Sequence, residues 1–114
     1  MTTISEQIVR NPEGGTVDMD GYPLPPDGFF VGGAGTVLIF RSHQEIDKSL
    51  ISLWLTRPPV AACVYVGWWT DQETGKVYVD WSSWTLDRPQ AEFLAATRGE
   101  IAFWDIRYSE SVKV

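Results

Sequence analysis

The chain has 114 residues, of which 15 are acidic and 9 are basic, and its net charge is −6. This length fits one domain with a single hydrophobic core, and direct nucleic-acid binding is not expected because lysine and arginine do not cluster. The first residues show no secretory signal, and no apolar run is long enough to cross a bilayer. We therefore expect a cytoplasmic protein that does not bind membranes.

The amino-terminal residues 1–27 are low in hydrophobicity and are interrupted by glycines and prolines. Such a composition lacks the periodic apolar positions of a packed helix or strand. The sequence predicts an extended or flexible arm over residues 1–27 and a single domain over residues 28–114.

The domain is expected to begin with a hairpin, because the runs FFV and TVLIF flank the sequence Gly-Gly-Ala-Gly. The same glycines could form a phosphate-binding loop, but that motif needs a following Lys-Ser/Thr and a helix. Here Gly35 leads directly into a β-branched apolar run. A turn between two strands is therefore favoured.

A helix is predicted next, since Ser42 and Glu45 have the spacing of a capping box and two prolines at 58 and 59 end the segment. Its apolar stripe comprises Ile46, Leu50, Leu53 and Trp54. The stripe has the spacing of one helix face, which we expect to pack on a sheet.

The remaining segments predict two more strands, a second helix and a last strand. Residues 60–70 are apolar on both alternations, as in a central strand, and the turn DQETGK joins them to a half-buried strand. Asp87 caps a helix that ends before Gly99, and residues 101–106 form the last strand, with 111–114 as a short edge. The expected fold is α+β, with two helices packed on a mostly antiparallel sheet of about five strands in the order ββαββαβ.

Few residues suggest catalysis or metal binding. His43 is the only histidine and has no neighbouring ligands, and Cys63 lies in an apolar run that predicts a small core residue. Two acidic pairs could in principle serve as general acid and base: Asp71 with Glu73, and Asp80 with Asp105. Carboxylates at strand ends more often accept structural hydrogen bonds, so we expect no enzyme, no cofactor and no metal.

The aromatic residues carry the functional signal. Trp68 and Trp69 are adjacent on one strand, so their rings point to opposite faces and cannot share one core. Tryptophan and tyrosine are enriched at interaction hot spots, which makes Trp69, Tyr78 and Trp84 the expected contacts with a protein partner or a second copy. The arm or a helix could instead cover these rings.

Two other functions stay open. A small-ligand or carbohydrate-binding module would also use flat aromatic rings, although the single asparagine, Asn11, leaves few of the amides that sugars usually contact. An acidic protein could also imitate DNA, but its carboxylates are scattered along the chain rather than arranged in rows.

The segments DGFFVGGAGTVLIF, WWTDQETGKVYVDWSSWTLDRPQA and TRGEIAFWDI resemble small accessory proteins encoded by bacteriophages of actinobacteria. The resemblance covers about residues 28–108. It implies a non-enzymatic protein that binds and modulates a host protein, and it transfers no catalytic residues to this chain.

Overall fold

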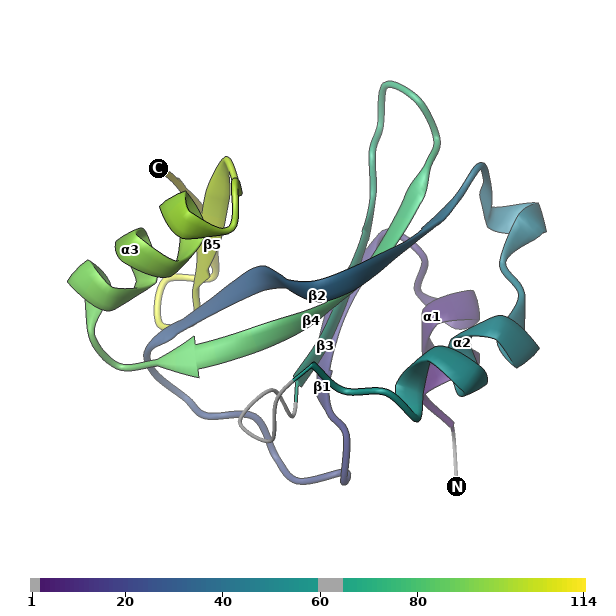
Figure 1. The fold of residues 1–114 in the computed structure, drawn as a ribbon, viewed down its shortest axis with the longest axis horizontal. Coiled ribbons are helices and arrows are strands. Elements are labelled where there is room, and N and C mark those ends of the chain that lie inside the picture. The colour runs from purple at the N-terminus through teal and green to yellow at the C-terminus, as the bar shows by residue number, and fades with distance from the viewer. Residues whose placement is uncertain (1–2, 60–64) are drawn as a thin grey trace.

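The computed structural model describes residues 3–59 and 65–114, which form a curled antiparallel sheet with helices packed against it (Figure 1). The sheet has six strands in the order β1-β3-β4-β2-β5-β6. In chain order the elements are α1 (Ile4–Arg10), β1 (Gly14–Asp18), β2 (Phe29–Phe40), the short 3₁₀ helix η1 (His43–Glu45), α2 (Lys48–Leu55), β3 (Tyr65–Thr70), β4 (Val77–Thr85), α3 (Arg88–Thr97), β5 (Ala102–Asp105) and β6 (Glu110–Lys113). The predicted α+β class and antiparallel pairing are confirmed, with three α-helices and six strands in place of two and about five.

The segment expected as an extended or flexible arm contributes a helix and an edge strand. The Thr3 hydroxyl caps α1 by accepting a hydrogen bond from the backbone of Glu6, and α1 buries Ile8 in the core. Strand β1 then pairs antiparallel with β3, with Gly14 opposite Trp69. One buried isoleucine and one strand pairing are enough to order a segment whose composition is poor in apolar residues.

The expected hairpin at Gly-Gly-Ala-Gly is wrong, because residues 29–40 form one continuous strand, β2. Along β2, Val31 pairs with Ser83, Ala34 with Trp81 and Leu38 with Val79, so β2 uses more residues than β4 over the same length. The extra residues form bulges, and Gly33 and Gly35 adopt φ of 76° and 82° there. Bulges bend a strand and increase its twist, so the glycines curl the sheet instead of ending the strand.

Helix α2 begins later than the capping-box spacing predicts. Ser42 makes no side-chain capping bond, and η1 follows it; Asp47 is the actual cap, accepting from the backbone N–H groups of Ser49 and Leu50 at 2.9 and 3.2 Å. The later start leaves Ile46 outside the helix, and the buried face of α2 differs from the expected stripe. Ile51 and Trp54 are buried, whereas Leu50 and Leu53 of the expected stripe are exposed.

The hydrophobic core lies between the helices and one face of the sheet. Helices α1 and α2 cover one end of the long strands, and α3 lies at the other end beside β5 (Figure 1). Trp54 of α2 stacks on Trp81 of β4 with ring centroids 4.5 Å apart. Helix α3 spans the residues predicted for it. The buried methyl groups of Ala91 and Ala95 allow this helix to pack closely against Val31.

Both helical layers use the same face of β4. Trp81 faces the core under α2, and Ser83, which pairs with Val31 under α3, is two residues further on and so shares that face. The alternate residues of β4, Tyr78, Asp80 and Ser82, face the opposite way. The helices therefore leave the second face of the sheet uncovered. The core position predicted for Cys63 lies outside the described residues.

Candidate functional site

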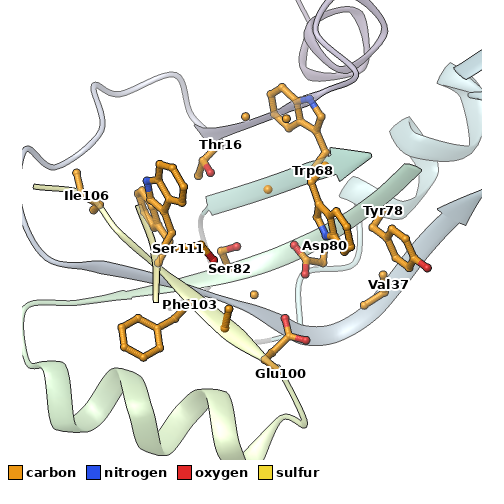
Figure 2. A pocket seen from close by; sticks show the side chains of 18 of the residues that line it. Thr16, Val37, Trp68, Tyr78, Asp80, Ser82, Glu100, Phe103, Ile106 and Ser111 are labelled. Atoms are coloured by element: carbon orange, nitrogen blue, oxygen red, sulfur yellow. The ribbon is translucent and has the colours of Figure 1, made fainter. Parts of the chain in front are cut away.

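The uncovered face of the sheet curls into a groove of about 1010 Å³ (Figure 2). Residues from all six strands line it, together with the loops before β5 and β6. The bulges of β2 produce this hollow, since they bend the sheet around its centre. The groove is therefore a direct consequence of the glycine run in β2.

A row of small and polar residues forms the floor of the groove. Gly67 of β3 pairs with Thr16 of β1 on one side and with Asp80 of β4 on the other. A Cβ atom on Gly67 would lie 3.2 Å from the hydroxyl oxygen of Ser82 and 3.4 Å from Oδ1 of Asp80. The missing side chain of Gly67 thus keeps the Asp80 carboxyl group accessible from the groove.

Aromatic rings rise on both sides of this floor. Trp69 and Tyr78 pair in register across β3 and β4 and stack with ring centroids 4.7 Å apart and an interplanar angle of 10°. In the opposite direction along β3, Tyr65 packs on Phe30, and Phe30 pairs with Trp104 of β5. Trp69 is 48% exposed and Trp104 is 43% exposed. The groove therefore offers large apolar rings to solvent on two sides.

Two carboxyl groups meet on the floor. A Cβ atom on Gly32 would lie 2.5 Å from Oδ2 of Asp80 and 3.0 Å from Oε1 of Glu100, so the two acids are neighbours around this glycine. Both side chains point into the groove (Figure 2). Oδ2 of Asp80 also accepts a hydrogen bond from the backbone N–H of Gly33 at 3.0 Å.

The environment of Asp80 favours its protonated form. The pKa of Asp80 is raised to about 7, chiefly by burial and also by the charge of Glu100, while the Gly33 hydrogen bond and the positive charge of Arg98 oppose the rise. Burial also raises the pKa of Glu100, again against Arg98. Near neutral pH the Asp80 carboxyl group can therefore hold a proton.

Arg98 acts on these acids from the helix-covered face of the sheet. Its guanidinium donates to the carbonyl oxygens of Val31 and Gly32 at 3.0 and 3.4 Å and to the hydroxyl of Ser83 at 2.7 Å. These bonds hold Arg98 against β2, and its side chain does not line the groove. The charge of Arg98 therefore lowers the pKa values of Asp80 and Glu100, while its side chain stays out of the groove.

The structure brings two of the three expected contact residues together. Trp69 and Tyr78 form the stacked pair at the groove, whereas Trp84 does not line it. Trp84 is partly exposed and donates from Nε1 to the carbonyl oxygen of Asp27 at 2.9 Å. Trp68 is buried and donates to the carbonyl oxygen of Asn11 at 2.7 Å, which confirms that it faces away from Trp69.

The acidic pair of Asp80 with Asp105, considered from the sequence, is not the one that forms. Asp105 is buried on β5, where its Oδ1 accepts from the backbone of Tyr108 at 3.4 Å, and the neighbour of Asp80 is Glu100. His43 is exposed and shares a hydrogen bond with the Thr70 hydroxyl at 3.1 Å. Within residues 3–59 and 65–114, no group of three or more His, Cys, Asp or Glu side chains could hold a metal ion.

Among the groove residues that sequence reasoning missed are Trp104 and Glu100. Trp104 alternates with the buried Phe103 and Asp105, so the period of two along β5 could have revealed an outward ring. Glu100 follows the end of α3 at Gly99 and carries no local signal. Only the curl of the sheet places it beside Asp80.

No family model, no curated protein and no solved structure matches this chain. In the part of the chain that the structure describes, no helix is long and apolar enough to cross a membrane.

Proposed function

We propose that this chain is a non-enzymatic binding domain that receives a segment of a partner protein in the groove. The observation that carries the proposal is the Trp69–Tyr78 stack, in which the Trp69 ring remains half exposed at the edge of the groove. The resemblance to phage accessory proteins suggests where the partner comes from. It would be a protein of the bacterial host, and binding would modulate its activity.

Several of the large apolar side chains that are exposed in the described part of the chain line the groove, although others lie elsewhere on the surface. Trp69, Trp104, Ile101 and Leu24 are all large, all exposed and all part of its lining. Single exposed apolar residues are common on soluble proteins, but contiguous ones mark interaction sites. Rigid tryptophan rings lose little conformational entropy on binding and often dominate interface energies. A partner segment covering these four side chains would gain most of its affinity from them.

A small ligand or carbohydrate is the second candidate, favoured by the volume of the groove. Small-molecule sites commonly enclose about 300–1000 Å³, and this groove lies at the upper end of that range. The flat face of Trp69 would suit a sugar ring, but no asparagine or glutamine is among the lining residues. A saturable signal on a glycan array that Trp69→Ala removes would support this candidate.

The Asp80–Glu100 pair is the feature of the described residues that most favours catalysis. A carboxyl group with a pKa of about 7 beside a second carboxyl could act as a general acid. Incubation with a glycan library followed by mass spectrometry would detect cleavage. Product formation that Asp80→Asn abolishes would contradict a non-enzymatic function.

Affinity enrichment with matched variants tests the protein-binding function. Immobilised wild type, Trp69→Ala, Trp84→Ala and Phe93→Ala would be exposed to a lysate of an actinobacterial host, and each enriched protein would be purified and titrated directly. Phe93 is the control, because it is 68% exposed on α3, away from the groove. We expect a partner whose affinity falls at least tenfold with Trp69→Ala and is unchanged with Phe93→Ala.

Trp84→Ala in the same series decides whether this third expected residue belongs to the binding surface. Because Trp84 lies outside the groove, we expect a smaller loss than for Trp69→Ala. If every enriched protein binds wild type and Trp69→Ala equally, the groove is not the binding site.

A further inference from the structure

The charge of the groove lining is entirely of one sign. Three acidic residues line it, Glu13, Asp80 and Glu100, and no lysine, arginine or histidine does so among the lining residues. Low-dielectric walls strengthen the field of such charges inside a concave site. The lining therefore attracts positively charged groups and repels anions.

An uncharged occupant would leave the two floor acids in a poor environment. Asp80 already lies largely out of water, and a segment filling the groove would remove more of the water around Asp80 and Glu100. Burying a carboxylate without a counter-charge is strongly unfavourable. An occupant that supplies a cation at this point would offset that cost.

The neighbouring Trp69–Tyr78 pair can contact the aliphatic stem of a cationic side chain. Tyr78 precedes Asp80 by two residues on the same face of β4, and the Trp69 ring stacks on Tyr78. Tryptophan and tyrosine faces attract ammonium and guanidinium groups and also pack against aliphatic stems. A side chain passing this pair would reach Asp80 above Gly67, which places no side chain of its own over the carboxyl group.

From this arrangement we infer that the groove recognises a lysine or arginine side chain of the partner protein, with its cationic group between Asp80 and Glu100 and its stem against Trp69 and Tyr78. This inference rests on the proposed function and names the partner chemistry. A sugar fits less well, because the lining offers acids without the amide groups that usually accompany them.

A titration with single-residue probes tests the inference. The probe is N-acetyl-lysine methylamide, followed by carbon-13 NMR of the Asp80 and Glu100 carboxyl carbons at constant ionic strength of about 0.15 M to screen diffuse attraction. The arginine equivalent tests the second cation, the side-chain-acetylated lysine probe tests charge, and maltotriose tests a neutral sugar. We expect saturable shifts with lysine or arginine and at least a fivefold weaker response with acetyl-lysine.

Three protein variants locate the response. Asp80→Asn and Glu100→Gln each remove one floor acid, and Asp20→Asn removes one exposed acid outside the groove with the same change in net charge. The Asp80→Asn variant keeps a side-chain oxygen that can accept from the Gly33 N–H group, so its fold should survive; Glu100→Gln alters a partly exposed side chain and gives an independent reading. We expect both floor variants to weaken lysine binding at least fivefold and Asp20→Asn to leave it unchanged.

Equal shifts with the acetylated probe, equal weakening by Asp20→Asn, or saturation by maltotriose but not by lysine would each overturn the inference. A partner that depends on Trp69 combined with no response to the cationic probes would reject the inference alone. A response to lysine without any Trp69-dependent partner would instead reject the proposed function.

Discussion

The Oδ2 atom of Asp80 accepts a hydrogen bond from the backbone N–H of Gly33, 3.0 Å away, where β2 bulges across β4. This one bond joins the feature that curls the sheet to the acid on the floor of the groove. It also stabilises the ionised carboxylate and thereby opposes the effect of burial. Stability and site chemistry are coupled at this point, and both can be measured.

Stability should fall as the pH rises toward neutrality. The pKa of Asp80 is about 7 in the folded protein against 3.8 ordinarily, so the folded state binds more protons between these values. By linkage, this contribution to stability is full below pH 4 and is lost as the pH rises through 7, amounting to roughly 2–4 kcal/mol. Urea unfolding of wild type and Asp80→Asn from pH 4 to 8 measures it. We expect the difference between the two proteins to change in this direction, and a pH-independent difference would contradict the burial of Asp80.

Gly33→Ala should destabilise more than Gly75→Ala, although both glycines have a φ of 76°. Each substitution imposes left-handed backbone strain of about 1 kcal/mol. A Cβ on Gly75 meets nothing within 4 Å, whereas one on Gly33 would lie 3.0 Å from the Glu100 carboxyl carbon. Thermal or urea unfolding of the two variants compares them. Equal losses of stability in the two variants would mean that the Glu100 side chain moves away from the new Cβ atom at no cost.

Substituting the tryptophans separately should divide them into core and surface. Trp54 is buried, stacks on Trp81 and donates to the carbonyl oxygen of Thr36 at 2.8 Å, so Trp54→Ala should cost about 3–5 kcal/mol. Trp69→Ala loses a stacked but half-exposed ring and should cost no more than about 1.5 kcal/mol. Urea midpoints give both values. If Trp69→Ala unfolds the protein, that ring is structural and not a contact surface.

Arg98→Ala should destabilise the fold and raise the pKa of Asp80 further. The substitution removes charged hydrogen bonds to Val31 and Ser83, which suggests a loss of about 1.5–3 kcal/mol, and it removes the cation that lowers the Asp80 pKa. Arg88→Ala, at the start of α3, breaks only an exposed pair with Glu92 and should cost less than about 0.5 kcal/mol. Carbon-13 titration of Asp80 together with urea unfolding checks both effects. An unchanged Asp80 titration would show that Arg98 is too distant to matter.

Much of the local structure follows from the sequence, because short-range chemistry determines it. The strand ending at Thr70, the strand from Val77 and the helix after Asp87 were predicted from alternation, turn residues and cap position, and opposite faces for Trp68 and Trp69 follow from the strand period. Asp87 does occupy the N-cap position of α3, but its side chain makes no capping hydrogen bond. These features depend on neighbours within a few residues.

The remaining features depend on contacts between distant segments. A glycine run can make a hairpin turn or a pair of bulges with the same residues, and only the pairing of β2 with both β4 and β5 decides between them. The ordering of α1 depends on Ile8 packing against α2 residues more than 40 positions away. Glu100 becomes part of the site only because the curled sheet brings it to Gly32. No local pattern contains that information.

The indole N–H signals of the labelled protein provide the clearest test of where a partner binds. Trp54 donates to the carbonyl oxygen of Thr36 inside the fold and does not line the groove, whereas Trp69 and Trp104 do. On addition of the purified partner, proton–nitrogen NMR should show the signals of Trp69 and Trp104 shifting to saturation while that of Trp54 stays in place. Saturable binding that leaves the Trp69 and Trp104 signals unmoved would show that the partner occupies another surface.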